Sequence, residues 1–359
     1  MPEIWLNYGS TEIVLDIRAE NLNQKVDSDG KVMNDDTITE RLKSINLAKP
    51  MELVVLHNSK SIQKIITSLF TICEQKSLPF PKILSDKKIA NQIREGLPEG
   101  STVSEFDDSE INPELVFVGE VEFDGLFGYE TISTRLLKRF GQESMLAAYA
   151  KRKSNSPAPG QPTESFVEAT KFVNNFDIQA IEIVAGSSGI VDFAVGHPSQ
   201  TCSLTKSLEA SAVKDVDEQK SMIISTGKDS SNRSLAKSLS SLWNCTTPIK
   251  KDGLAILAAE CQDGLGSEAI QQYVEGRMSP DRLKNPTKYI DGMENLLYLH
   301  ESRPDFQVGI ISTLPELYAK KLGMIPLSGI KQAVEYILKT QGPRQKISIV
   351  IDGARLLLR

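Results

Sequence analysis

The feature that most constrains the fold of this chain is a repeated alternation of short apolar runs with helical patterns. Residues 53–56 have the composition of a buried strand, and in residues 61–75 the apolar side chains recur on one helical face. The second half repeats this order, because the apolar run 254–259 is followed by a helical pattern that begins at Ser267. Strands that alternate with helices favour largely parallel sheets joined by right-handed crossovers. The sequence therefore predicts an α/β protein whose parallel sheets are flanked by helices.

The chain is long enough for two domains. Its 359 residues are 40% hydrophobic and 25% charged, which is typical of globular domains with their own cores. A polar stretch of mixed charge at residues 205–220 indicates a domain boundary. We therefore predict an N-terminal domain over residues 1–210 and a C-terminal α/β domain over residues 211–359. Hairpins are predicted within residues 3–17 and 180–194.

Composition narrows the partners and the compartment. The net charge is −6 and the 41 basic residues are spread along the chain, whereas nucleic acids are bound by a basic stripe, so no nucleic-acid partner is expected. The longest apolar runs are too short to cross a bilayer, so no membrane association is expected. Four cysteines lie far apart without a CxxC pair, which argues against a zinc site and a disulfide framework. With no signal-peptide pattern at the start, these features predict a cytoplasmic protein.

The sharpest local motif follows the strand at residues 254–259, where a turn with two glycines leads into a helix. A helix N-terminus at the carboxyl end of a strand exposes backbone N–H groups that can bind a carboxylate or phosphate. The alternative is that the glycines only permit a tight turn while a serine caps the helix. The residues that would form the anion site are Asp263, Gly264, Gly266, Ser267 and Glu268.

This segment resembles the second-domain signature of the nickel-dependent lactate racemases. Three further segments resemble that family in the same order along the chain: residues 7–9 in the opening hairpin, residues 224–226, and the closing strand 348–353. The resemblance thus extends along nearly the whole chain. It implies two α/β domains with a ligand cleft between them. It also implies a nickel-pincer nucleotide that accepts a hydride from the 2-carbon of lactate, with histidines as acid and base, a tethering lysine and a nickel-binding histidine.

The chain departs from that family at the positions that carry the chemistry. Where the family has Asp-x-Thr-Arg after the first core strand, this chain has residues 56–59, so the carboxylate and the guanidinium are missing, and the point charge of Lys60 cannot replace bidentate recognition. The basic pair that carries the tethering lysine corresponds to Glu130 and Thr131. Tyr149 takes the position of the nickel-binding histidine, and a phenol is protonated at neutral pH. A shifted alignment would make Lys138 the tether, although a solvated helix face is the simpler interpretation of residues 135–139.

Only three histidines exist to fill the vacant roles. His57 is the candidate catalytic residue because it lies at the carboxyl end of a core strand, and a structural role there is the alternative. His300 is interpreted as a cation at a helix C-terminus, and His197 as a loop residue without a function. No metal site is expected from these residues, because none shares the spacing that metal ligands use.

Three hypotheses follow from these residues. The first is a lactate-racemase-like protein that binds a small anion, either a carboxylate or a nucleotide, at the glycine turn with help from His57 and Lys60. The second is an active 2-hydroxy-acid racemase or epimerase with a rearranged site, and only this hypothesis requires the nickel-pincer nucleotide. The third is a structural interaction partner, which would present a large exposed apolar patch. The sequence leaves the cofactor, the ligand and the oligomeric state open.

Overall fold

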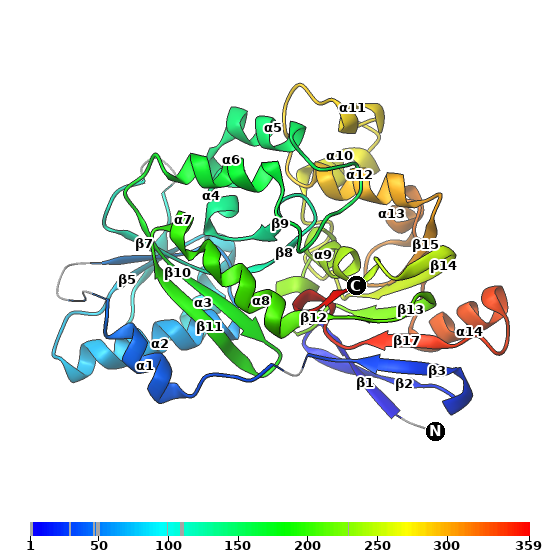
Figure 1. Cartoon of the computed structure of the whole chain (residues 1–359), viewed down its shortest axis with the longest axis horizontal. Coiled ribbons are helices and arrows are strands. Elements are labelled where there is room, and N and C mark those ends of the chain that lie inside the picture. Colours follow the sequence, from blue (N-terminus) through cyan, green and yellow to red (C-terminus); the bar gives the residue numbers. More distant parts are fainter. Residues whose placement is uncertain are drawn as a thin grey trace.

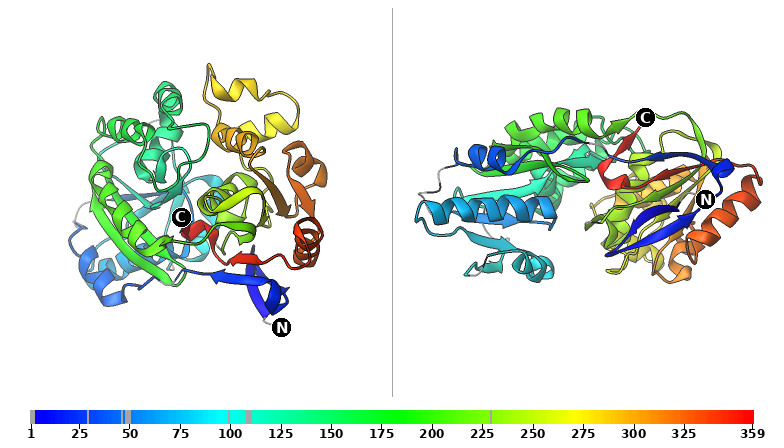
Figure 2. Two further views of the ribbon diagram at one scale, coloured as in Figure 1. Left: turned by 45° about the vertical axis from the view of Figure 1, so that its right-hand side comes forward. Right: turned by 90° about the horizontal axis from the view of Figure 1, so that it is seen from below.

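The computed structural model describes residues 3–28, 30–45, 47, 51–98, 100–107, 111–228 and 230–359. These residues form two lobes, each built around a six-stranded sheet (Figure 1). The lobes lie side by side, and in the view from below they are clearly separate (Figure 2). The prediction of an α/β fold with largely parallel sheets flanked by helices is confirmed.

The first sheet is parallel except for one hairpin at its edge, where β11 runs antiparallel to β10. Its strands, in spatial order, are β11 (Gly189–Gly196), β10 (Gln179–Gly186), β7 (Leu115–Glu120), β4 (Glu52–Val55), β5 (Lys82–Ser85) and β6 (Val103–Glu105). The helices of this lobe are α1 (Asp35–Leu42), α2 (Lys60–Gln75), α3 (Lys87–Glu95), α4 (Ile132–Phe140), α5 (Gln142–Ala150), α6 (Glu164–Val173), α7 (Pro198–Thr201) and α8 (Thr205–Ala212).

The second sheet is parallel throughout. Its strands, in spatial order, are β16 (Ile325–Leu327), β15 (Phe306–Ile311), β14 (Ile249–Ala258), β13 (Gln219–Ser225), β17 (Ile347–Val350) and β3 (Leu22–Val26). Its helices are α9 (Leu235–Cys245), α10 (Glu268–Val274), α11 (Asp281–Lys284), α12 (Met293–Ser302), α13 (Glu316–Lys321) and α14 (Ile330–Gln341).

Short elements complete the fold. The two-stranded pairs are β1 (Glu3–Tyr8) with β2 (Thr11–Asp16), β8 (Glu122–Asp124) with β9 (Gly128–Glu130), and β12 (Val213–Lys214) with β18 (Leu357–Leu358). The 3-10 turns are η1 (Ala19–Asn21), η2 (Cys202–Leu204), η3 (Ser230–Asn232) and η4 (Gly353–Arg355). Both predicted hairpins are present as β1–β2 and β10–β11.

Each sheet is buried on both faces, because successive side chains point to opposite sides of a strand. In β7, Val116 and Val118 pack with apolar residues of α1 and α2, whereas Phe117 packs with those of α4 on the other face. In the second sheet, Ile224 packs against the α9 side and Ile223 against the hairpin β1–β2 and α14. Continuous apolar runs were therefore a valid signal of central strands.

Two local expectations need correction. The pattern of residues 130–152 predicts one helix, but Gly141 separates α4 from α5. The polar stretch of residues 21–36 contains Asp-Gly and Asn-Asp pairs that predict turns, yet residues 22–26 form β3, which pairs with β17 and completes the second sheet. The N-terminal segment of the chain thus packs on the C-terminal lobe (Figure 1). The proposed division at residue 210 stays a prediction.

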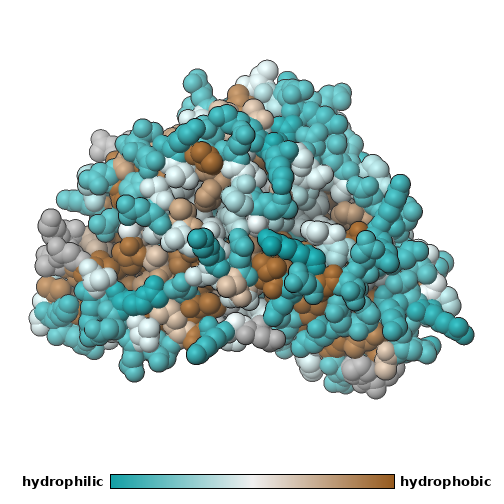
Figure 3. Space-filling model, viewed as in Figure 1, coloured by the Kyte–Doolittle hydropathy of each residue, from teal (hydrophilic) through white to brown (hydrophobic). Residues whose placement is uncertain are grey.

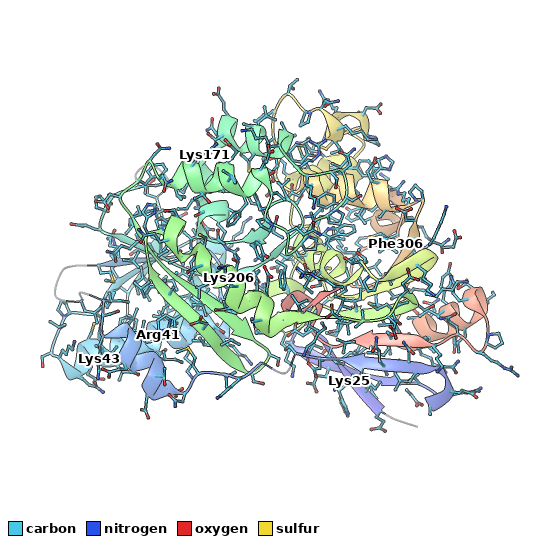
Figure 4. The ribbon with its side chains drawn as sticks, in the orientation of Figure 1. Lys25, Arg41, Lys43, Lys171, Lys206 and Phe306 are labelled. Carbon is cyan, nitrogen blue, oxygen red and sulfur yellow. The ribbon has the colours of Figure 1, made fainter. Side chains whose placement is uncertain are left out.

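Apolar side chains are scattered over the face shown in Figure 3 and are surrounded by hydrophilic ones. The exposed large apolar residues include Trp5 and Val14, which are neighbours across the hairpin β1–β2. Basic side chains on this face come from separate elements, for example Lys171 on α6 and Lys206 on α8 (Figure 4). No helix in the described part of the chain is long and apolar enough to span a membrane.

Candidate functional site

The carboxyl ends of strands from both sheets meet between the lobes. Beyond β4 the chain passes through His57 and Ser59 into α2, and the Ser59 hydroxyl caps this helix by accepting a hydrogen bond from the N–H of Ile62 at 3.2 Å. Lys60 is the first residue of α2, so its ammonium group and the helix N-terminus lie together. Lys228 follows β13 and Arg355 follows β17 at the same junction.

Two adjoining pockets lie at this junction, and both are lined by Lys60 and Lys228. The first has a volume of about 480 Å³ and is also lined by Lys64, Arg355 and the β10–β11 turn. The second has a volume of about 430 Å³ and is also lined by Arg233. We call these two pockets together the cationic cleft. Each volume lies within the range of about 300 to 1,000 Å³ that is usual for small-molecule sites.

The cations of the cleft differ in how far they are neutralised. Lys228 pairs with Glu12, and Arg233 forms two hydrogen bonds with Asp263, at 2.7 and 3.0 Å. Arg355 lies 3.5 Å from a carboxylate oxygen of Glu120. Exposed Lys60, by contrast, has no carboxylate of the described residues within ion-pair distance. Its positive charge is therefore available to a ligand.

Asn232 adds an unused donor to the second pocket. The residue is 2% exposed, and its side-chain oxygen accepts a hydrogen bond from the Thr226 hydroxyl at 2.7 Å. Its amide nitrogen has no hydrogen-bond partner among the described residues. A buried N–H without an acceptor is costly, so a bound oxygen atom at this position would be stabilising.

His57 is buried behind the cleft at 3% exposure. Its Nε2 accepts a weak hydrogen bond from the N–H of Glu120 at 3.4 Å, which assigns the proton of the neutral ring to Nδ1. Burial, and then the positive charge of Arg135, lower the pKa of His57 well below its usual value. His57 is therefore neutral at physiological pH, and its catalytic role stays a prediction.

A small cavity of about 60 Å³, here called the inner cavity, is lined by His57, Glu122, Arg135 and Lys237 among other residues. Ser230 lines both this cavity and the second pocket, so the two are neighbours. The inner cavity therefore lies next to the cationic cleft.

A group of partly buried charges lies next to the inner cavity. Arg135 pairs with Glu122 at 2.6 Å and with Glu130 at 3.0 Å, and Lys138 pairs with Asp124 at 3.2 Å and with Glu130 at 3.0 Å. We call these five residues the inner charge network. Burial alone would raise the pKa of Glu130, but Arg135 and Lys138 outweigh it and lower that pKa. The interpretation of residues 135–139 as a solvated helix face is wrong for Arg135 and Lys138, whose side chains are 13% and 20% exposed.

The glycine turn is held mainly by its own hydrogen bonds. Gly264 and Gly266 have φ angles of 78° and 72°, which favour glycine, and the N–H of Gly264 donates to the carbonyl of Cys261. Ser267 accepts from the N–H of Ile270 and donates to the carbonyl of Asp291, so it caps α10. Glu268 is exposed and bonds to Gln272.

Of the five turn residues, Asp263 is linked to the cationic cleft through its ion pair with Arg233. Neither pocket of the cleft is lined by any of the five. Lys60 and His57 lie at the cleft and its inner cavity, so the structure separates them from most of the turn. Ligand binding by the turn stays a prediction, while its capping role is the feature that the geometry supports.

Sequence reasoning missed Lys228, Arg233 and Arg355. A usable signal was present, because each follows a run recognised as a buried strand, and ligands gather at the carboxyl ends of parallel strands. Arg135 and Lys237 carry no such signal, since each lies in a helix whose orientation only the folded chain reveals.

Comparison with solved structures shows which known fold this chain shares. No protein-family model matches the chain, and no curated protein matches it in sequence. The lactate racemase apoprotein from Thermoanaerobacterium thermosaccharolyticum superimposes with a TM-score of 0.72 at 16% identity, over 100% of both chains. This chain has the fold of that racemase. A structural-genomics protein from Thermotoga maritima superimposes with a TM-score of 0.66 at 10% identity, over 93% of this chain and 99% of its own.

The lactate-racemase-like fold raises the question of whether the residues here fit a nickel-pincer nucleotide. Tyr149 is buried, its hydroxyl donates to the carbonyl of Leu283 at 2.7 Å, and burial raises its pKa, so it stays protonated and engaged. The amine of Lys138 is held by two carboxylates and is not free to tether a cofactor. Among the described residues no group of three His, Cys, Asp or Glu could hold a metal ion. These residues do not fit the cofactor.

The histidines are equally unsuited to a shared metal site. His197 caps α7, where its Nδ1 lies 2.7 Å from the Ser199 hydroxyl and its Nε2 lies 3.1 Å from the carbonyl of Phe176. His300 lies in the last turn of α12, as expected, but burial and then Arg303 lower its pKa, which disfavours the predicted cation. With His57 beyond β4, the three come from separate elements.

Proposed function

We propose that this lactate-racemase-like protein binds a small anion in the cationic cleft and does not use nickel-pincer chemistry. The observation that carries the proposal is the position of Lys60. Its ammonium group has no ion-pair partner among the described residues, and it lies at the N-terminus of the 16-residue helix α2 in a pocket that Lys228 also lines. A cation and a helix N-terminus both attract negative charge.

The supporting groups suit a carboxylate or a phosphate. Lys228 and Arg233 add positive potential on one side of Lys60, and Arg355 adds it on the other. The free amide of Asn232 can donate to an anion's oxygen. A small carboxylic acid would occupy part of one pocket, whereas a nucleotide would need most of the cleft. The ligand class therefore remains a small anion that carries a carboxylate or a phosphate.

Calorimetric titration of the full chain with lactate, pyruvate and a nucleoside triphosphate at constant ionic strength tests the proposal. For the anion that binds, Lys60→Glu should weaken the affinity about tenfold, or about 1.4 kcal/mol. The matched control is Lys206→Glu, which makes the same charge change on the exposed surface of α8. The proposal fails if none of the three anions binds, or if both variants weaken binding equally.

The alternative of an active 2-hydroxy-acid racemase or epimerase gains no specific support, because Tyr149 and Lys138 are engaged in structural contacts. It makes a distinct prediction. If the protein is such a racemase, the chain purified from its native host would contain nickel and a covalently attached nickel-pincer nucleotide. It would also interconvert the two lactate enantiomers. An unmodified chain without nickel would agree with the proposed loss of that chemistry.

A further inference from the structure

The inner cavity contains a lysine that the binding proposal does not use. Lys237 lies on α9 and reaches the cavity lined by His57, Glu122 and Arg135. Part of the Lys237 residue is exposed to solvent, whereas His57 is buried. Its amine has no hydrogen bond or ion pair with any residue that the structure describes. The Lys237 amine thus lies next to the cationic cleft without a carboxylate partner in the described part of the chain, and this suggests a role in chemistry at the site.

We propose that Lys237 forms an imine with the carbonyl carbon of a small 2-oxo acid whose carboxylate is bound in the cationic cleft. This inference rests on the proposed function and adds a substrate class and a covalent step to it. The class follows from the arrangement of the site. In a 2-oxo acid the carbonyl carbon is bonded directly to the carboxylate, so the anion site and the amine must be adjacent.

Two observations support that adjacency. Ser230 lines both the second pocket and the inner cavity, so the two spaces are neighbours. Arg233 lines the pocket and Lys237, four residues later, lines the cavity. A carboxylate bound between Lys60 and Arg233 would therefore direct its neighbouring carbonyl towards the amine of Lys237.

The surroundings shift Lys237 towards the neutral amine, which is the nucleophilic form. Although part of the side chain is exposed, desolvation by the surrounding protein and then the positive charge of Arg135 lower the pKa of Lys237, and they outweigh the opposing effect of Glu122 and Glu130. Lys138 shows the opposite case within the same region. Asp124 and Glu130 outweigh the effect of burial there and raise its pKa well above the usual value. Of these two lysines, Lys237 is the one prepared for attack.

The step balances without an oxidant or a reductant. The nitrogen of Lys237 attacks the carbonyl carbon, and the C–O double bond opens to a carbinolamine. One proton moves from nitrogen to oxygen, and a second proton, taken from solvent, converts the hydroxyl into departing water. The products are a protonated imine and one water molecule.

Reductive trapping tests this inference. The full chain is incubated with pyruvate and cyanoborohydride, its intact mass is measured, and the modified residue is located by peptide mapping. The expected result is one adduct per chain, on Lys237, formed at least about tenfold faster than on exposed Lys206, because bound pyruvate would be held next to the Lys237 amine. Lactate has no carbonyl group and should give no adduct. No adduct with pyruvate, or equal labelling of Lys206 and Lys237, would overturn the inference.

The variant Lys237→Arg keeps the positive charge but removes the nucleophile. It should bind pyruvate in the calorimeter and lose the adduct, whereas Lys206→Arg should retain it. Binding of pyruvate by the wild-type chain without any adduct would sink the imine and leave the proposed function intact. Absence of both binding and adduct would remove both proposals.

Discussion

The inner charge network and the cationic cleft are built from the same kinds of side chain, yet their charges are arranged in opposite ways. In the network, Arg135 and Lys138 are each held by two carboxylates. In the cleft, Lys60 has no carboxylate partner among the described residues. Lys237, which lines the inner cavity, has none among them either. A cation that is already neutralised stabilises the fold, whereas one that is not neutralised can serve a ligand.

The largest expected effect comes from breaking the network. Lys138→Met leaves Asp124 without its cation and leaves Glu130 with Arg135 alone, in a partly buried region. The free energy of unfolding, measured by urea denaturation, should fall by about 4 kcal/mol. Lys171→Met is the matched control, because Lys171 forms only an exposed pair with Glu168, and its effect should stay below about 0.5 kcal/mol. Equal effects of the two variants would show that the network is not structural.

A pH dependence should come from Glu294, which is buried near the network. Burial, opposed by Lys138 and supported by Asp291, raises its pKa from 4.5 to about 7. Between these two pKa values the unfolded chain has lost the proton that the folded chain still holds, so this residue makes stability fall as the pH rises from about 4.5 to about 7.

Glu294→Gln keeps an oxygen that can accept the hydrogen bond from the Tyr289 hydroxyl. The variant should match the wild type at pH 4.5 and exceed its unfolding free energy by about 3 kcal/mol at pH 8. Denaturation curves at the two pH values measure this difference. A variant that is less stable at pH 8 would contradict the assignment.

A smaller effect is expected at Tyr149, which links the two lobes. Its hydroxyl donates to the carbonyl of Leu283 at 2.7 Å. Tyr149→Phe leaves that carbonyl without its donor, so the unfolding free energy should fall by about 1 kcal/mol. The same variant should leave anion affinity unchanged, because Tyr149 does not line the cationic cleft. A loss of anion binding would place Tyr149 in the functional site instead.

The smallest change in stability is expected in the cleft. Lys60→Gln removes an exposed charge that takes part in no ion pair with the described residues. The unfolding free energy should stay within about 0.5 kcal/mol of the wild type. The affinity for the anion should nevertheless fall. Lys60 would belong with the structural cations if its loss destabilised the protein as much as Lys138→Met.

The sequence predicted the parts of the fold that depend on local patterns. The apolar run at residues 53–56 and the Ser267 cap could be recognised because burial and capping leave local signals. The strand β3 could not, since Asn23, Gln24 and Lys25 give it a polar character and its partner β17 lies more than 300 residues away. Pairing between distant segments is not encoded in either segment alone.

The candidate site was predictable only in part. Lys60 and His57 were found because they follow a central strand. The network was missed because Glu130 and Lys138 become partners only after β9 and α4 pack together. Their charges in the sequence have the pattern of a solvated helix face. Only the folded structure shows that they form an ion pair that is partly buried.

The most direct test of the central claim is a crystal structure of the full chain grown with pyruvate or lactate. The account predicts density for the carboxylate within hydrogen-bond distance of Lys60 in the cationic cleft. Density at the glycine turn, next to Gly264 and Ser267, with an empty cleft would contradict it and restore the anion site expected from the sequence.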